Sequence, residues 1–412
     1  MSAFMKRKAC IQKAVTAILV VCLLAGLQRL VVPKYAENLL EGGFTNAYYS
    51  EAGGHQVLMV GDCELYENFD PVTLWENYGI DSYIRGNAQQ LPWQSYYLLK
   101  EALRYETPKV AVFNVLELKY NEPQKEEYNR LTIDGMKWSI DKWNIIRASM
   151  TEEESMMEYI FPILRYHARI MQLTKEDLEY YWNNEAKHTV AGYYMRIDAS
   201  PYEIGQWGGE NYVGTYSDEH ALANPGPKNE KREAQAAEGW SAEADGNSAA
   251  EGWPAETEAE AESRQTDKVG PLGEHAMHYL DLIRELCEEK GIRLLLVKAP
   301  SVSPIWYEEW EDQIVAYAKQ YGLDYINFLY LVDEIGIDFS ADTYDEGLHM
   351  NYSGAVKCAD YLGGYLAEHY KLEDRRKDPS VSAKWQKIKE TRNLIYKTQQ
   401  KELEENGEVV SY

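Results

Sequence analysis

Five short runs of apolar residues, separated by longer segments, dominate the hydrophobic pattern of this chain. The runs are Val57–Val60, Ile80–Ile84, Val110–Val115, Ile292–Val297 and Tyr325–Phe328. Polar or turn residues bound each run, which is typical of short buried strands. Most of the intervening segments are long enough for a helix. Because strands that alternate with helices pair in parallel, the pattern predicts an α/β fold: a five-stranded parallel sheet between two layers of helices.

Three segments show clear helical periodicity. Apolar residues recur every three to four positions over Ala276–Cys287 and over Trp306–Tyr321. A third helix is predicted from Ser353, as its N-cap, through Leu366. The loop just before this last helix therefore contains His349.

The sheet-forming residues fall into two parts, 36–223 and 269–371. Within the first part, residues 120–200 read as a helical insertion. Between the two parts, residues 224–268 are rich in Ala and Glu with almost no aliphatic residues to bury, which predicts a disordered acidic linker. The tail, 372–412, is charged, and the spacing of its few apolar residues indicates one amphipathic helix.

Residues 1–35 combine basic residues with an apolar run. Lys6–Lys13 is rich in Lys and Arg and precedes Ala14–Leu27, which predicts a cytoplasmic N-terminus and an exported remainder. The run reaches spanning length through Val32 only if Arg29 lies at the outer interface. We favour an uncleaved signal anchor in the cell membrane over a cleaved signal peptide, because no clear small-x-small cleavage site follows the run.

Charge and cysteine content narrow the classes of partner. The net charge of −25 argues against nucleic acid, which requires clustered Lys and Arg. The exported part has three cysteines, Cys63, Cys287 and Cys358, and an odd number leaves at least one thiol free. The sequence shows no metal-ligand spacing and no nucleotide-binding fingerprint, so we expect neither a metal nor another cofactor.

Two segments far apart in the chain carry candidate chemistry. The first strand stops at Gly61-Asp62-Cys63, which delivers a thiol to a turn. A doubly wound sheet would bring this turn and the His349 loop to the same edge. There Cys63, as a candidate nucleophile, and the acid-flanked His349 would form a chemical pair.

The order and spacing of these blocks resemble those of the SGNH/GDSL hydrolase superfamily. The matching residues are Gly61-Asp62-Cys63 at the first strand, Gly86 after the second, Asn114 at the third, and an acid with His349 before the last helix. The stretches Asn68–Pro71 and Ala88–Tyr97 more narrowly resemble its membrane-anchored, exported branch, akin to proteins of teichoic-acid D-alanylation and exopolysaccharide O-acetylation. The resemblance covers residues 36–200 and 270–370.

The resemblance implies a flavodoxin-like three-layer fold and an oxyanion site at its carboxyl edge. The donors would be the N–H of Cys63, the N–H of Gly86 and the side chain of Asn114, with Asn87 as a substitute. The family's serine is replaced here by Cys63, whose flanking acids oppose ionisation of the thiol.

The orienting acid stays open between two residues. The family usually places Asp three residues before the histidine, and that position is Glu346 here. Asp345 has the usual residue type one place too early. Either carboxylate could orient the imidazole of His349.

The function that the resemblance implies is that of an esterase or O-acyltransferase acting on acetyl-type acyl groups of a cell-envelope polysaccharide. A membrane-bound O-acyltransferase would be its partner and would supply acyl groups across the bilayer. The alternative is a catalytically inactive scaffold of the same fold that binds glycan or that partner, and the Cys63 substitution keeps this alternative open.

Overall fold

A parallel five-stranded sheet in the order β2-β1-β3-β4-β5 forms the centre of the protein. The strands are β1 (Val57–Gly61), β2 (Ser82–Gly86), β3 (Val110–Asn114), β4 (Arg293–Lys298) and β5 (Asp324–Asn327). The computed structural model describes residues 3–33, 43–179, 189–202 and 270–410. All five strands expected from the apolar runs are present, and the order is that of a flavodoxin-like doubly wound fold.

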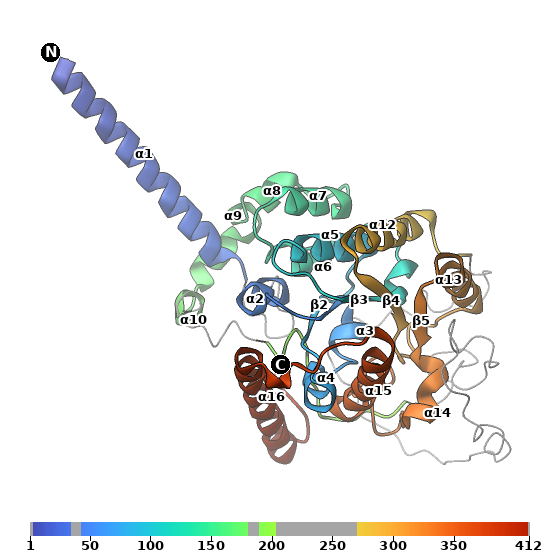
Figure 1. Ribbon diagram of the computed structural model, residues 1–412. Coiled ribbons are helices and arrows are strands. Elements are labelled where there is room, and N and C mark those ends of the chain that lie inside the picture. The colour runs from blue at the N-terminus through green and yellow to red at the C-terminus, as the bar shows by residue number, and fades with distance from the viewer. Residues whose placement is uncertain (1–2, 34–42, 180–188, 203–269, 411–412) are drawn as a thin grey trace, which may run out of the picture.

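Helices cover both faces of the sheet (Figure 1). On one face lie α5 (Pro92–Ala102) and α12 (Glu274–Lys290). Helix α13 (Glu308–Tyr321) is bonded to α12, because its Tyr317 hydroxyl donates to Asp281 at 2.8 Å. The other face carries α4 (Pro71–Tyr78) and α15 (Tyr352–Tyr370). The predicted three-layer architecture is therefore confirmed.

Strand register aligns the carboxyl ends of the strands. Gly61 of β1 is level with Gly86 of β2, and Asn114 of β3 is level with Val297 of β4. Short helical segments follow three of these ends: α3 (Cys63–Tyr66), η1 (Val115–Lys119) and η4 (Phe328–Leu331), with α14 (Val332–Ile335) directly after η4. The edge thus gathers residues from distant parts of the sequence.

The last sheet helix begins slightly earlier than predicted. Asn351, not Ser353, is the N-cap of α15, and its side-chain oxygen accepts the N–H groups of Ser353 and Gly354 at 3.0 and 3.3 Å. An Asn side chain reaches two residues ahead as well as a Ser side chain does, so sequence alone did not separate the two caps. His349 still lies in the loop immediately before the helix.

The predicted helical insertion is present and packs on α5. Its elements are α6 (Glu126–Ile133), α7 (Ile140–Ser149), α8 (Met156–Ile160), α9 (Ile163–Tyr166), η2 (His167–Gln172) and α10 (Lys175–Glu179). Leu98 of α5 forms an apolar cluster with Ile145 and Ile146 of α7, and Trp93 donates to Ser149 at 3.1 Å. The predicted acidic linker, 224–268, lies outside the described residues.

One helix near the N-terminus is apolar and long enough to cross a membrane. It is α1 (Ala3–Val31), in which Ile11–Val31 has a mean hydropathy of 2.2. Its composition fits a signal anchor or a signal sequence. After α1, the short helix α2 (Gly43–Glu51) packs against β2 and α6.

The charged tail is part of the folded unit. It forms η5 (Arg375–Lys377) and α16 (Pro379–Asn406). Trp385 of α16 is fully buried, stacks on Trp75 with ring centroids 5.4 Å apart, and donates its indole N–H to Asp81 at 2.8 Å. Arg392 adds an ion pair to the buried Asp70 at 2.7 Å.

Replacing Trp385 with alanine should therefore destabilise the whole domain. The expected loss is about 3–5 kcal/mol in the free energy of unfolding, because the variant leaves a cavity against Trp75 and removes a donor from Asp81. Urea denaturation of the detergent-solubilised protein measures it. Leu394→Ala, at a position of the same helix that is 66% exposed, is the control and should change stability little. Equal effects of the two substitutions would show that α16 is not packed as described.

Candidate active site at the carboxyl edge of the sheet

Asp62 fixes the turn that presents Cys63. It is the N-cap of α3, and its Oδ1 accepts the backbone N–H of Glu64 at 3.2 Å. The same oxygen accepts the amide of Asn114 from β3 at 2.7 Å. Because Asp62 is almost wholly buried, these bonds hold β1, α3 and β3 in one arrangement. Cys63 is the first residue of α3 and stays partly exposed.

Of the two candidate acids, Asp345 is the one that contacts the imidazole. Its Oδ2 lies 2.6 Å from His349 Nδ1, and its Oδ1 accepts the His349 backbone N–H at 2.7 Å. Glu346 has a left-handed backbone, with φ 60°, and its N–H donates to the Ser200 carbonyl at 3.3 Å. The geometry thus separates two residues between which the sequence could not choose.

Thiol and imidazole meet beside a carboxylate that the sequence analysis missed. Ligand atoms of Cys63, Glu67 and His349 all lie within 4.8 Å of one another. Glu67 Oε2 is 3.7 Å from His349 Nδ1 and accepts the hydroxyl of Tyr344, whose ring stacks near the imidazole. Glu67 follows Cys63 by four positions, a spacing that places two side chains on one side of a helical turn, and this spacing could have identified it.

Asn68 ties the histidine loop to the cysteine turn. Its Oδ1 accepts the N–H of Met350 at 2.6 Å, and its Nδ2 donates to Ser301 Oγ at 2.9 Å. Asn68 has no exposed surface, so both bonds are shielded from water. The pairing fixes where His349 stands relative to Cys63.

A buried ion pair supports α3 from β4, which is separated from β1 by β3. Lys298 Nζ at the end of β4 lies 3.1 Å from Glu64 Oε1, and neither side chain is more than 2% exposed. The remaining Lys298 protons are donated to the carbonyls of Ala299 and Ser301 at 2.8 and 3.2 Å. A buried ammonium that is fully bonded in this way stabilises one position of α3.

The predicted oxyanion donors differ in what they contact. The Asn114 amide is bonded to Asp62, and the Asn87 amide donates to Thr45 at 3.2 Å and to Gln90 at 3.3 Å. A Cβ at Gly86 would lie 2.8 Å from the Gly61 carbonyl, so the position admits only glycine. The N–H of Cys63 starts a helix and therefore has no acceptor within that helix.

Burial, together with two nearby carboxylates, favours the neutral form of the Cys63 thiol. Burial raises the pKa of the Cys63 thiol to about 11; Asp62 and Glu67 add to the rise and His349 opposes it. Burial alone would lower the pKa of His349, but Glu67 and Asp345 outweigh it and hold that pKa well above its usual value. Burial also raises the pKa of Glu67 to about 7, with Asp345 adding to the rise. At neutral pH the pair is thus a thiol beside an imidazolium.

The same three residues could hold a metal ion. A sulfur, a carboxylate oxygen and an imidazole nitrogen are ligands that zinc accepts, and three protein ligands leave its fourth position open. With Nε2 as the ligand atom, Asp345 on Nδ1 would fix the ring, as carboxylates bonded to zinc-bound histidines do. Spacing along the sequence could not indicate this set because His349 is far from Cys63 in the chain.

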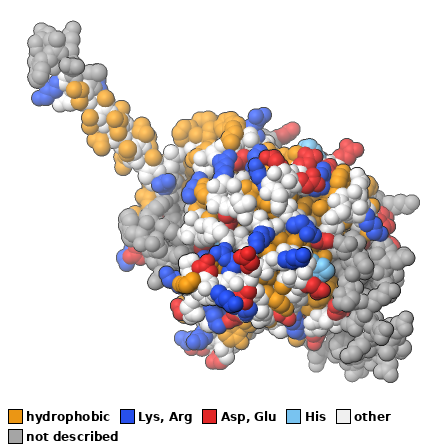
Figure 2. Space-filling model, viewed as in Figure 1, with side chains coloured by type: hydrophobic (Ala, Val, Ile, Leu, Met, Phe, Trp, Pro, Cys, Tyr) orange, Lys and Arg blue, Asp and Glu red, His pale blue; other side chains and the backbone are white. Residues whose placement is uncertain are grey.

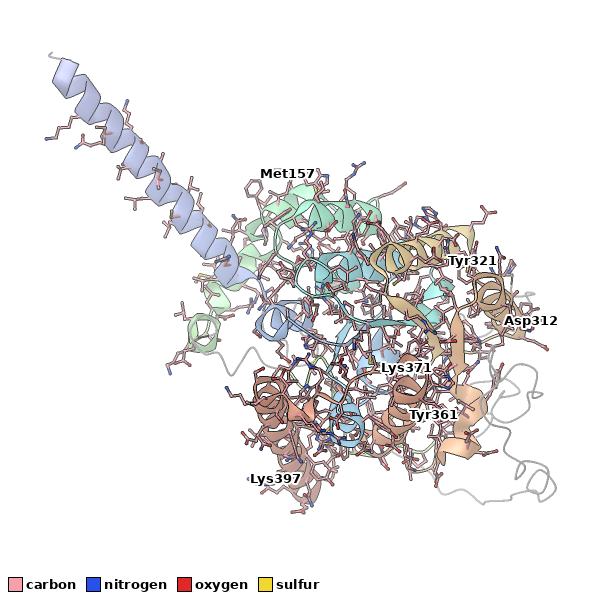
Figure 3. All side chains as sticks on the ribbon, in the orientation of Figure 1. Met157, Asp312, Tyr321, Tyr361, Lys371 and Lys397 are labelled. Carbon is pink, nitrogen blue, oxygen red and sulfur yellow. The ribbon has the colours of Figure 1, made fainter. Side chains whose placement is uncertain are left out.

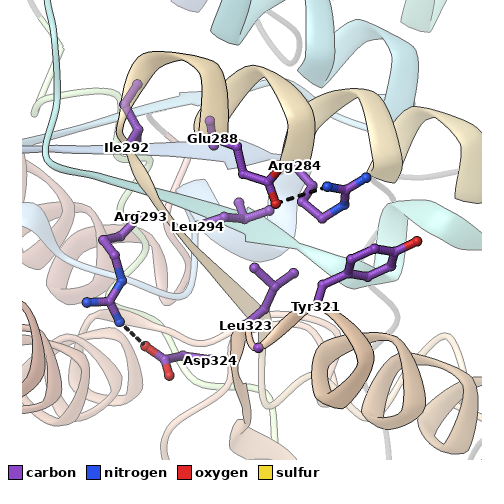
Figure 4. A pocket seen from close by; sticks show the side chains of 10 residues that line it. Arg284, Glu288, Ile292, Arg293, Leu294, Tyr321, Leu323 and Asp324 are labelled. Carbon is purple, nitrogen blue, oxygen red and sulfur yellow. Dashed lines mark hydrogen bonds and ion pairs between the residues drawn. The ribbon is translucent and has the colours of Figure 1, made fainter.

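A separate small pocket lies at the opposite, amino edge of the sheet. It has a volume of about 180 Å³, and Figure 4 shows its lining around the starts of β4 and β5. Its charged groups are already paired, Arg293 with Asp324 at 3.1 Å and Arg284 with Glu288 at 2.9 Å. Its described lining residues include Cys287 but no histidine that could act on the thiol.

Comparison of the chain with known protein families, with curated proteins and with solved structures finds no match in any of the three. What is established is the fold, a five-stranded parallel α/β sheet, and the apolar helix near the N-terminus. The geometry of the site carries the functional argument from here.

The raised thiol pKa predicts slow alkylation of Cys63 at neutral pH. The rate with iodoacetamide should rise about tenfold per pH unit, because only the thiolate reacts and its fraction climbs until pH approaches the pKa of about 11. Peptide mass spectrometry after timed quenching distinguishes Cys63 from the buried Cys287 and Cys358. A rate already at its plateau at pH 7 would contradict the described electrostatics.

Glu67→Gln should lower the pKa of His349. The substitution removes the carboxylate that contributes most to the rise and keeps an acceptor for Tyr344. NMR titration of the 13C-labelled imidazole, assigned with His349→Gln, measures it. Glu346→Gln is the matched control and should leave the titration unchanged. If both variants titrate like the parent, Glu67 does not set the charge of the site.

Proposed function

We propose that the protein is an SGNH-like esterase or O-acyltransferase that acts on acetyl-type groups of a cell-envelope polysaccharide. The observation that carries the proposal is the grouping of the Cys63 sulfur with His349, whose Nδ1 lies 2.6 Å from Asp345 Oδ2. A nucleophile, a base within reach and an acid that orients the base form the arrangement that acyl transfer requires.

The chemistry would run in two halves through a thioester. Neutral His349 accepts the thiol proton, and the Cys63 sulfur attacks the acyl carbonyl carbon to give a tetrahedral oxyanion. The Cys63 N–H is positioned at the helix start to donate to that oxyanion. His349 then returns the proton to the departing sugar oxygen, which leaves an acyl group on Cys63. Water or a second hydroxyl attacks the thioester, and the thiol is regenerated.

The raised pKa of His349 supports an activity that increases on the alkaline side of neutrality. His349 must lose a proton before it can act as base, and Glu67 and Asp345 both favour its protonated form. Bound substrate that displaces water from the partly exposed side of the site would change the pKa of His349. Asp345 and His349 form that side, with side chains 24% and 13% exposed.

The cellular setting follows from α1 and from the family resemblance. An uncleaved α1 would anchor the protein in the cell membrane and leave the site outside the cytoplasm, facing envelope polymers. The resemblance to the D-alanylation and O-acetylation branch supports a membrane-bound O-acyltransferase as the partner that provides acyl groups.

A catalytically inactive scaffold is the second candidate, and specific contacts favour it. The amides of Asn114 and Asn87 are bonded to protein acceptors, and the thiol has a pKa of about 11. Such a protein would bind glycan or the acyltransferase partner at the same edge without turning substrate over.

Hydrolysis of a p-nitrophenyl acetate ester by the full-length protein tests the proposal. Cys63→Ala and His349→Ala should each lower kcat/KM by at least about a hundredfold, as expected for loss of a nucleophile or a general base. Cys287→Ala and the exposed His369→Ala are matched controls and should retain activity. A chelator in the assay keeps metal off the Cys63 sulfur.

The outcome separates the two candidates. Activity that survives both Cys63→Ala and His349→Ala in folded protein would refute the proposed mechanism. If the parent protein shows no activity and both variants still bind glycan, the protein is the inactive scaffold. Cys63→Ser adds a third comparison, because a gain of esterase activity would show that the geometry is competent and that the thiol is the limiting group.

A further inference from the structure

The helical insertion exposes an unusual amount of apolar surface. Most of the large hydrophobic side chains exposed outside α1, among the described residues, lie between positions 138 and 178. We call six of them the insertion face: Trp138, Ile140, Met157, Phe161, Leu164 and Met171, which are 53, 64, 50, 41, 50 and 90% exposed. Apolar patches of this kind on a soluble protein mark an interaction site.

The part of the insertion face on α9 and η2 lies beside the end of α1. Helix α9 and η2 contact α1, and Arg169 of η2 donates to the Val31 carbonyl, the last residue of α1, at 2.8 Å. Figure 1 shows α8 and α9 next to the base of α1, and Figure 2 shows hydrophobic side chains gathered over this region. Met157 points outward there (Figure 3). If α1 spans a bilayer, this face meets the bilayer surface.

The charges near the insertion face are compatible with a membrane interface. Arg165 pairs with Glu126 at 3.1 Å, and Arg169 pairs with Asp177 at 3.2 Å, so two of the cations beside the apolar side chains already have partners. Trp, Phe and Met are residues that enter the headgroup boundary readily, and Trp is enriched there. The net charge of −25 leaves apolar burial, not attraction to anionic lipid, as the force for docking.

We propose that the insertion face docks into the outer surface of the lipid bilayer that holds α1. The anchor and the face would then give the domain two attachments, which fix the orientation of the sheet above the membrane. This inference rests on α1 and on the surface of the insertion; it does not depend on the proposed catalysis.

Photolabelling of the full-length protein tests it. One copy per nanodisc is assembled in phosphatidylcholine that carries a diazirine on its acyl chain, illuminated, digested and mapped by mass spectrometry. Peptides spanning the insertion face should carry at least about tenfold more lipid adduct than the peptide containing Leu394, because burial in the interface brings them to the acyl chains. Leu394 on α16 is equally apolar and 66% exposed, and Lys397 of the same helix lies on the far side of the protein from Met157.

Two exposed substitutions sharpen the result. In the double variant Met157→Ser, Met171→Ser, adducts on the insertion peptides should fall severalfold while adducts on α1 persist. Adducts confined to α1, or adducts equally frequent on the insertion face and at Leu394, would overturn the proposal. The insertion face would then bind a second copy or another protein, neither of which is present in these discs.

Discussion

The bonds of Asp62 determine the geometry on which the site depends. One buried carboxylate oxygen accepts donors from α3 and from β3, so the turn after β1 has a single position relative to the sheet. The Glu64–Lys298 ion pair fixes the same turn from β4, and Asn68 ties it to the loop after β5. Each of these polar groups is buried and would be costly if unpaired. The distance between thiol and imidazole is therefore a consequence of the hydrogen bonding beneath them.

Burial and the carboxylates beside the turn also explain why the pKa of Cys63 is unusual for a candidate nucleophile. A nucleophilic cysteine normally lies in an electropositive setting that lowers its pKa. Here burial raises the pKa of Cys63 to about 11, and the neighbouring Asp62 and Glu67 add to the rise. Asp62 is needed to build the turn, and Glu67 interacts with the imidazole. The carboxylates that build the site thus also disfavour the thiolate of Cys63. The reactivity of Cys63 would depend on how bound substrate changes the pKa of the thiol.

Much of the fold could be predicted from the sequence, whereas the details of the site could not. The five apolar runs predicted the strands because buried parallel strands need continuous hydrophobic residues, and the loop position of His349 followed from the periodicity of the last helix. Local spacing could not choose between Asp345 and Glu346, because the choice depends on a left-handed turn at Glu346. The involvement of Asn114 and Asn87 with protein acceptors depends on contacts between distant segments, as does the packing of α16 on Trp75. Such contacts leave no signal in one sequence.

We expect Cys63 to carry the acyl group during turnover. Rapid acid quenching of the full-length protein during turnover of an acetyl ester, followed by peptide mass spectrometry, tests it most directly, because a thioester survives at low pH. We expect one acetyl group on the peptide that contains Cys63, absent in Cys63→Ala and no longer formed in His349→Ala. Turnover without any adduct on Cys63, or with the acetyl group on another residue, would contradict it.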